Sequence, residues 1–200
     1  MRIDEFENIY ILTKKKFYKF YKSSFKKIIL IDNLELYYNQ NITNTNSILI
    51  SCNTNLIVPE KIYKKFNLSI NIHPGSHLFP GRDPHHWASY ANAKFFGSTA
   101  HIMEKKVDSG KIFDFEYSKI SLKLSPSGYQ EIANNTSVIL IKRILESLYK
   151  GFILVKSKNW NTKTNKRIDI LKMCNFKGLD SEEIKKREFS LQGFEKFFLY

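Results

Sequence analysis

The chain has 200 residues, which is enough for one well-cored domain with a small appendage but not for two domains of ordinary size. Hydrophobic residues make up 42% of the chain and aromatic residues 14%, so the composition excludes a disordered protein as the default interpretation. The net charge of +13 favours anionic partners, among them nucleic acid, anionic lipid, a nucleotide-linked substrate or a polyglutamylated cofactor.

The sequence carries no signal for export or membrane insertion. The acidic amino terminus lacks the apolar core of a signal peptide, and the longest aliphatic runs, Ile28–Ile31 and Val138–Ile141, are too short to cross a bilayer. Cys52 and Cys174 form neither a CxxC pair nor a disulfide framework. We therefore expect a cytoplasmic protein in a reducing compartment.

The first elements predict a βαβ unit. Asn8–Thr13 and Lys27–Asp32 have short, β-branched apolar cores typical of buried strands. In the connector Lys14–Ser24, Phe17 and Phe20 recur at helical spacing among lysines, which indicates an amphipathic helix on a sheet. A basic and aromatic surface for nucleic acid or membrane would show the same residues, but the docked helix explains their spacing and is preferred.

A second strand and helix follow before the most informative stretch. We expect a loop over Leu34–Asn46, a strand over Ser47–Ser51 and a turn at residues 52–55. Pro59 opens a helix that is expected to run to Phe66.

The remaining elements are a helix over Pro84–Ala93, strands over Phe95–Glu104 and Ile112–Ile120, and a long helix over Tyr129–Tyr149. Ser125-Pro126 provides the cap and first-turn proline of that long helix.

After residue 150 the chain becomes basic and loop-like up to Arg167, and the last twenty residues combine a charged helix with several phenylalanines. We expect a first domain over residues 1–150 and an extension over residues 151–200. Its aromatic residues would cover the sheet of the same chain or that of a partner, and the second alternative implies a homodimer.

Asn71 and His73 stand two residues apart after an apolar, β-leaning run, so both side chains leave the same face of a strand. Pro74-Gly75 ends that strand, which places the pair at a carboxyl end, where open α/β sheets bind ligands. Asp108 follows another strand-like run, and Gly110 permits a tight turn that would bring its carboxylate to the histidine. Alone, Asn71-x-His73 is a weak signal, because a hydrogen-bonded histidine at a strand end is common.

The joint pattern is more specific. Ile70-Asn-Ile-His-Pro-Gly75, then Arg82, Gly97-Ser-Thr-Ala-His101 and Val107-Asp-Ser-Gly-Lys-Ile112 together resemble the catalytic core of the formyltransferases that use 10-formyltetrahydrofolate. The match covers roughly residues 47–120. It implies an α/β fold with a Rossmann-like core and a mostly parallel sheet, here shortened at the amino terminus.

Formyl transfer suits these residue types. The site must stabilise a tetrahedral oxyanion and move a proton from the attacking amine. Asn71 can donate to the oxyanion without titrating, His73 can donate to it or shuttle the proton, and Asp108 would orient His73 and favour its protonated form. The resemblance assigns the catalytic triad to the same three residues, and it leaves open which of them accepts the proton.

The resemblance also implies a place for the folate cofactor on either side of the triad. The residues concerned are Asn55, Leu56, Ile57, Glu104, Lys105, Lys106 and Val107. Leu56 and Ile57 are equally compatible with ordinary packing at a sheet edge, but their position after a strand at the ligand edge favours the cofactor.

Arg82 is the candidate substrate-binding residue, because a guanidinium pairs well with phosphate oxygens, although a solvated loop arginine has the same sequence. A metal cluster is not expected, since neither spacing nor family supports one for His77, Asp83, His85 and His86. We expect Trp87 to anchor the core, and His101 to pack or hydrogen-bond on its strand.

The acceptor is inferred from the segments that each branch of the formyltransferases carries beside the catalytic core. The methionyl-tRNA enzymes append a tRNA-binding barrel, formyltetrahydrofolate hydrolases add a regulatory domain, and the glycinamide ribonucleotide enzymes have a glycine-rich loop where this chain has Lys14-Lys-Lys-Phe-Tyr18. The chain best resembles the sugar N-formyltransferases, which act on nucleotide-linked 3-amino or 4-amino sugars for surface polysaccharides such as the O-antigen of lipopolysaccharide. The alternatives are another small amine, such as glycinamide ribonucleotide, and an inactive basic binding module. Nucleic acid is not an expected partner.

Overall fold

The computed structural model describes residues 6–21, 28–35, 45–150 and 156–200. It contains a six-stranded sheet in the order β2-β1-β3-β4-β5-β6. The strands are β1 (Asn8–Leu12), β2 (Ile28–Ile31), β3 (Thr45–Cys52), β4 (Phe66–His73), β5 (Phe95–Ile102) and β6 (Ile112–Lys119). The pairs from β2 to β4 are parallel, whereas β5 and β6 join antiparallel, so the sheet is mixed and mostly parallel as predicted.

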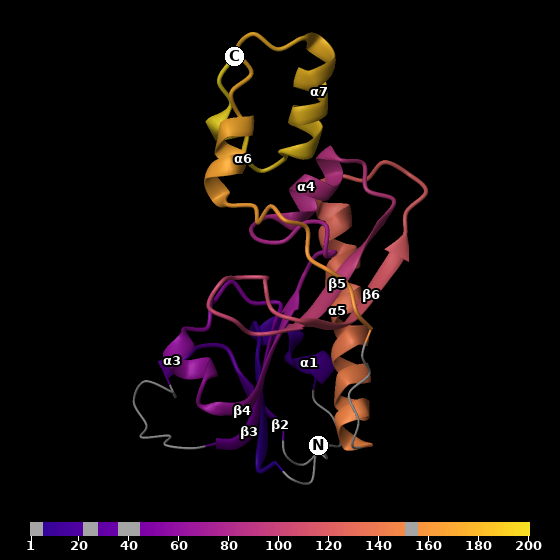
Figure 1. The fold of residues 1–200 in the computed structure, drawn as a ribbon. Helices are drawn as coiled ribbons and strands as arrows, with labels where there is room; N and C mark the ends of the chain where they lie inside the picture. The colour runs from indigo at the N-terminus through magenta and orange to yellow at the C-terminus, as the bar shows by residue number, and fades with distance from the viewer. Residues whose placement is uncertain (1–5, 22–27, 36–44, 151–155) are drawn as a thin grey trace.

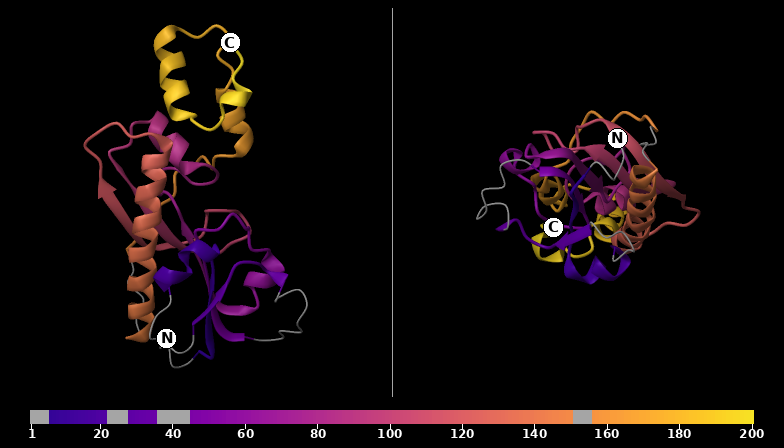
Figure 2. Two further views of the ribbon diagram at one scale, coloured as in Figure 1. Left: turned by 180° about the vertical axis from the view of Figure 1, so that it is seen from behind. Right: turned by 90° about the horizontal axis from the view of Figure 1, so that it is seen from below.

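The helices cover both faces of this sheet (Figures 1 and 2). The elements near the sheet are η2 (Lys15–Phe17), α1 (Tyr18–Tyr21), α3 (Glu60–Tyr63), α4 (Pro84–Tyr90) and α5 (Pro126–Tyr149). The predicted βαβ unit is confirmed by the parallel pairing of β1 with β2. The end of the helix expected over Lys14–Ser24, and most of the loop expected over Leu34–Asn46, lie outside the described residues.

The core follows the alternation of side chains along the strands. Ile48 and Ile50 face α1 and α5, while Leu49 packs on the other face with Ile62 of α3. The helix expected from Pro59 to Phe66 is shorter than predicted, because Phe66 begins β4 and buries its ring against the sheet.

Helix α5 is capped as predicted, with the Ser125 side chain accepting a hydrogen bond from the Gly128 amide. Arg143 joins this helix to the edge strand β6 through ion pairs with Asp114 at 2.8 Å and Glu116 at 2.6 Å. None of the helices in the described residues is long and apolar enough to span a bilayer.

The carboxy-terminal segment forms a small helical unit at one end of the molecule (Figure 1). It comprises α6 (Arg167–Met173), α7 (Ser181–Ser190) and η3 (Glu195–Phe197), of which α6 was not predicted. Phe176 and Phe194 are buried within this unit, which packs on α4. Phe194 lies against His86 of α4, so the expectation that it covers the sheet of its own chain is wrong, while packing of the carboxy-terminal aromatic residues on the sheet of a partner stays a prediction. The domain boundary at residue 150 and the homodimer remain predictions.

Candidate active site

The site lies where β4 ends and the chain turns away from the sheet. Asn71 and His73 lie at the carboxyl end of β4, and their side chains leave the same face of the strand, as their spacing predicts. Asn71 pairs in register with His101 of the antiparallel neighbour β5, and His73 pairs with Thr99. The Thr99 hydroxyl donates to the carbonyl of Gly75 at 2.8 Å, which holds the turn that ends β4.

Asp108 stands at the centre of this group. It follows β5 in a turn with a left-handed φ of 49°, and its carboxylate is buried. Its Oδ2 accepts from His73 Nδ1 at 3.1 Å and from the Gly81 amide at 2.8 Å. Its Oδ1 accepts from Asn71 Nδ2 at 3.4 Å and lies 3.2 Å from His101 Nε2. The structure thus brings Asn71, His73 and Asp108 together around one carboxylate.

This environment changes the acidity of both partners. Burial alone would raise the pKa of Asp108, but the charge of His73 and hydrogen bonds from His101 and His73 lower it far below its ordinary value. Burial alone would lower the pKa of His73, but the charge and hydrogen bond of Asp108, with a bond to the Phe79 carbonyl, raise it.

His73 uses both ring nitrogens as donors. Nδ1 donates to Asp108, and Nε2 lies 2.9 Å from the carbonyl oxygen of Phe79, which can only accept. An imidazole that donates twice carries a proton on each nitrogen, in agreement with its raised pKa. In this arrangement His73 is suited to donate a hydrogen bond and not to accept a proton.

His101 belongs to the site more closely than the sequence indicated. Its Nδ1 donates to the Ile102 carbonyl on its own strand, as expected, but its Nε2 reaches Asp108 and lies 3.0 Å from the Asn71 amide. The sequence included His101 in the pattern Gly97-Ser-Thr-Ala-His101, but its place beside Asp108 depends on the register between β4 and β5, which no local pattern reveals.

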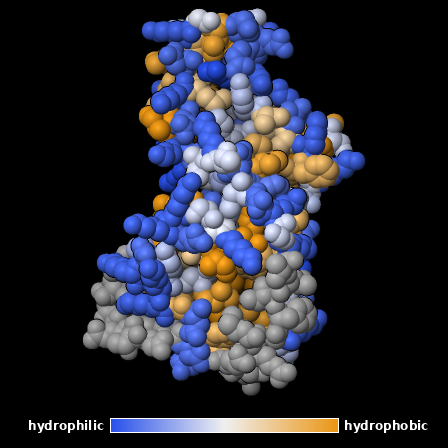
Figure 3. Space-filling view, viewed as in Figure 1, coloured by the Kyte–Doolittle hydropathy of each residue, from blue (hydrophilic) through white to orange (hydrophobic). Residues whose placement is uncertain are grey.

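The group opens into a cleft of about 700 Å³. Asn55, Leu56, Ile57, Glu104, Lys106 and Val107, predicted for the cofactor, line this cleft, whereas Lys105 does not. Leu56, Ile57 and Val107 are 42%, 65% and 43% exposed, so these apolar side chains do not serve the core. On the viewed face most of the surface is hydrophilic, and apolar surface is concentrated in its lower half (Figure 3).

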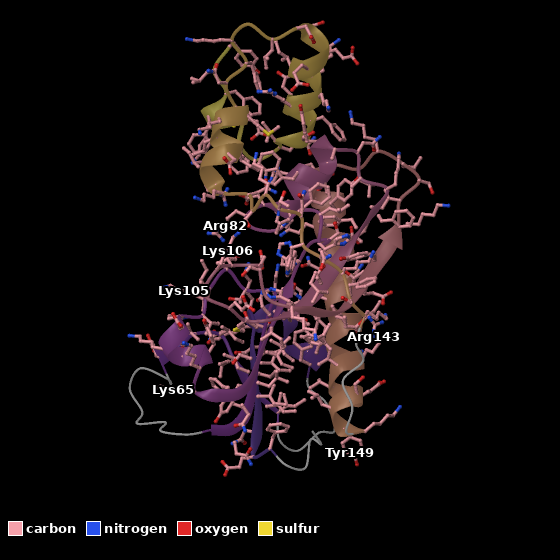
Figure 4. The ribbon with its side chains drawn as sticks, in the orientation of Figure 1. Lys65, Arg82, Lys105, Lys106, Arg143 and Tyr149 are labelled. Atoms are coloured by element: carbon pink, nitrogen blue, oxygen red, sulfur yellow. The ribbon has the colours of Figure 1, made fainter. Side chains whose placement is uncertain are left out.

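Another flank of the cleft is cationic. Arg82, the predicted substrate residue, lines it together with Lys166 and Arg167. Arg167 pairs with Asp83 at 3.0 Å and lies over the Phe194 ring, while Arg82 extends from the loop after β4 on the same side of the molecule as Lys106 (Figure 4). A guanidinium and an ammonium group here are suited to bind an anionic ligand.

A smaller cavity of about 250 Å³ continues the cleft past Asn53, Asn55 and Gln130, which line both spaces. It adds Lys14, from the loop after β1, and Lys16 of η2. Lys14 donates to the Asn55 side chain at 3.2 Å. Side-chain ammonium groups therefore stand where the glycinamide ribonucleotide enzymes are expected to have a glycine-rich loop.

Three of the four residues considered for a metal have other partners, among them Asp83, which pairs with Arg167. His77 stacks on Tyr117, and the buried His86 donates from Nδ1 to the Ser190 carbonyl at 2.8 Å. Burial, with the charges of His86 and Arg167, lowers the pKa of His85 to about 3, so this residue is neutral at physiological pH. Trp87 packs between α4 and the carboxy-terminal unit, not in the sheet core.

Comparison with known proteins shows the fold. No protein-family model matches the sequence, and no curated protein sequence matches it. Among solved structures, a 4-N formyltransferase from Francisella tularensis matches 93% of this chain and 88% of its own length, with a TM-score of 0.72 and 17% identity.

Two other matches are structures obtained with a folate. WlaRD, a sugar 3N-formyltransferase studied in the presence of dTDP and 5-N-formyl-THF, has a TM-score of 0.66 at 19% identity over 92% of this chain and 78% of its own. HypX from Aquifex aeolicus, in complex with tetrahydrofolic acid, has a TM-score of 0.65 at 13% identity over 93% of this chain and 34% of its own. The chain therefore has the α/β fold of the formyltransferases, as the sequence resemblance predicted.

Proposed function

We propose that this protein transfers the formyl group of 10-formyltetrahydrofolate to the amino group of a nucleotide-linked amino sugar. The observation that carries the proposal is the buried Asp108 carboxylate, which gathers Asn71 and His73 at the floor of a cleft with an apolar and a cationic flank. This arrangement occurs on a fold that is similar to sugar N-formyltransferases.

The proposed reaction depends on hydrogen-bond donors that stabilise an oxyanion. The acceptor amine attacks the formyl carbon, a carbon–nitrogen bond forms, and the formyl oxygen becomes an oxyanion, which is bound by Asn71 and replaces the Phe79 carbonyl as the acceptor of the His73 Nε2 proton. The bond from this carbon to N10 of the folate then breaks. The amine loses one proton and N10 gains one, so tetrahydrofolate and the formamide are the products. Asp108 keeps His73 charged and oriented throughout.

The cofactor is assigned to the apolar flank. Leu56, Ile57 and Val107 expose enough apolar surface to cover a pterin ring, and polar backbone between residues 104 and 108 can satisfy its edge. Two of the similar structures were obtained with a folate, which supports this assignment for the present chain.

The acceptor is assigned to the cationic flank and the adjoining cavity. Arg82 and Lys166 on one side and Lys14 and Lys16 on the other would bind the phosphates of a nucleoside diphosphate. The structure of WlaRD was obtained in the presence of dTDP, which supports a nucleotide-linked acceptor. We further propose a role in surface polysaccharide synthesis.

The test is direct. Purified protein is incubated with 10-formyltetrahydrofolate and a panel of dTDP-linked and UDP-linked 3-amino and 4-amino sugars, with glycinamide ribonucleotide included as a further acceptor. Chromatography with mass detection should find one sugar that gains the mass of a formyl group, and H73N should abolish this product. Formylation of glycinamide ribonucleotide alone, or of no acceptor, would contradict the proposal.

A further inference from the structure

A segment outside the recognised motifs crosses the candidate site. Between residues 156 and 166 the chain runs from the sheet edge to α6, and backbone hydrogen bonds fasten it to the loop after β4. The Asn161 amide donates to the His77 carbonyl at 2.9 Å, the Asn165 amide donates to the Pro80 carbonyl at 2.8 Å, and the Arg82 amide donates back to Asn165 at 2.8 Å. The segment is thus held against the loop that carries Gly81, a donor to Asp108.

Trp160 is the residue of this segment that reaches the triad. Its ring lies edge-to-face against His73, with centroids 5.7 Å apart at 77°, and against His101, with centroids 5.1 Å apart at 87°. Both imidazoles that lie next to Asp108 therefore share one aromatic neighbour. Trp160 does not line the cleft itself, so it stands behind the groups that would meet a substrate.

The indole nitrogen holds a second part of the site. Nε1 of Trp160 donates to the Gly110 carbonyl at 2.8 Å, and this bond fixes the turn that carries Asp108. The turn is also tightly packed at Gly110, because a Cβ added there would overlap the Ile102 carbonyl oxygen. One side chain therefore contacts both imidazoles and the backbone beside the carboxylate they share.

We propose that Trp160 is a positioning residue, which holds His73, His101 and the Asp108 turn in their mutual arrangement and keeps water away from them. The segment before α6 then completes the active site, although it lies far from the motifs in sequence. This inference deepens the proposed function, but its first test needs no acceptor.

The Trp160 ring is expected to strengthen the attraction between His73 and Asp108. A hydrogen-bonded charge pair attracts more strongly where an apolar neighbour excludes water. If Trp160 is removed, water reaches the imidazole, both burial and the influence of Asp108 weaken, and the raised pKa of His73 moves down towards its ordinary value. A residue with a merely structural role at a distance would leave this pKa unchanged.

The experiment compares W160F, W160A and W87F with the native chain. W160F keeps a ring but loses the donor to Gly110, W160A loses both, and W87F changes the other tryptophan, whose indole nitrogen has no partner in the described residues. The pKa of His73 is followed by NMR titration of its ring resonances, assigned with H73N. We expect the pKa to fall in W160F, to fall further in W160A if that variant folds, and to stay unchanged in W87F.

In the titration, the inference is overturned by a His73 pKa in W160F and any folded W160A equal to the native value, or by an equal shift in W87F. Once an acceptor is known, kcat should fall about tenfold or more in W160F with KM for the cofactor little changed, because a small misplacement of catalytic groups is costly. An unchanged kcat also overturns it. Failure to find any acceptor would instead count against the proposed function, while the titration still decides the role of Trp160.

Discussion

His73 donates a hydrogen bond from Nδ1 to Oδ2 of Asp108 across 3.1 Å, and both side chains are only 3% exposed. The same oxygen accepts from the Gly81 amide, so one carboxylate joins the end of β4 to the loop that follows it. A buried charge of this kind is tolerated because His73, the Gly81 amide and the Asn71 side chain each direct a donor at it. The pair is therefore both the centre of the proposed chemistry and a structural element.

Replacing Asp108 with asparagine tests this double role. D108N removes the negative charge and leaves buried donors facing an amide group, so the free energy of unfolding should fall by about 3 kcal/mol. The measurement is urea denaturation at neutral pH. D32N is the matched control, because Asp32 accepts from the neighbouring Asn33 side chain and pairs at the surface with the exposed Lys15, a pair worth less than about 1 kcal/mol. Equal losses in the two variants would contradict the buried pair as described.

The pair also predicts a pH dependence of stability. The pKa of Asp108 is lowered in the folded state, so its contribution is present above its unfolded pKa and is lost as pH falls through the folded value. The pKa of His73 is raised, so its contribution is complete below its unfolded pKa and is lost as pH rises through the folded value. The stability difference between the native chain and D108N should therefore be largest between about pH 4 and pH 6.5.

This profile is measured by urea denaturation of both proteins at a series of pH values. A difference that stays constant at all pH values, or that grows in alkaline solution, would show that His73 and Asp108 do not titrate as a coupled pair.

Much of the site was predictable because it rests on local patterns. The period of two places Asn71 and His73 on one face, Pro74-Gly75 ends the strand, and Gly110 permits the turn near Asp108. Each of these inferences needs only a few consecutive residues, and the structure confirms the geometry in each case.

The remainder depends on contacts between distant segments. The place of His101 beside Asp108 follows from the antiparallel register of β4 with β5, and that of Trp160 follows from the path of the segment before α6. The carboxy-terminal aromatic residues were expected on a sheet because their sequence shows only that they need cover, whereas Phe194 finds it on α4. Short helix α6 was missed because the basic residues around Arg167 resemble a loop.

The apolar flank predicts a selective loss of cofactor affinity. I57S removes an exposed side chain from the cleft, so stability should change by less than about 0.5 kcal/mol. Affinity for 10-formyltetrahydrofolate should fall about fivefold to tenfold, as expected for losing about 1 kcal/mol of apolar contact. Binding is followed by calorimetry with tetrahydrofolate or a stable folate analogue. L122S is the control, because Leu122 is 74% exposed and lies outside the cleft, and an equal loss there would rule out a specific contact.

Arg82 predicts how the anionic part of the acceptor is bound. R82A should weaken binding of dTDP or UDP about tenfold, because a charge-assisted hydrogen bond to phosphate is lost, and the remaining binding should depend less on salt. Calorimetric titration at two ionic strengths measures both effects. K142A removes one positive charge from the exposed side of α5, away from the cleft and its smaller neighbour, and should leave binding unchanged. Equal weakening in K142A would mean that only net charge attracts the nucleotide.

The close approach of the loop after β4 to the segment before α6 predicts a special requirement at Gly81. Its φ is +96°, and a Cβ there would overlap the Asn165 carbonyl oxygen. Gly178 also has a positive φ, of +74°, but a Cβ there meets nothing within 4 Å. G178A should therefore cost only the backbone strain of roughly 1–2 kcal/mol, whereas G81A should cost more.

The two variants should differ even more in the site itself. In G81A the backbone must move away from Asn165, which displaces the amide that donates to Asp108 Oδ2. We expect the His73 pKa to fall and any formyl transfer to drop by about tenfold or more in G81A, with neither effect in G178A. Thermal unfolding, NMR titration of His73 and turnover measure the three quantities. If G81A behaved like G178A in all of them, the contact between Gly81 and Asn165 would have no part in holding the triad.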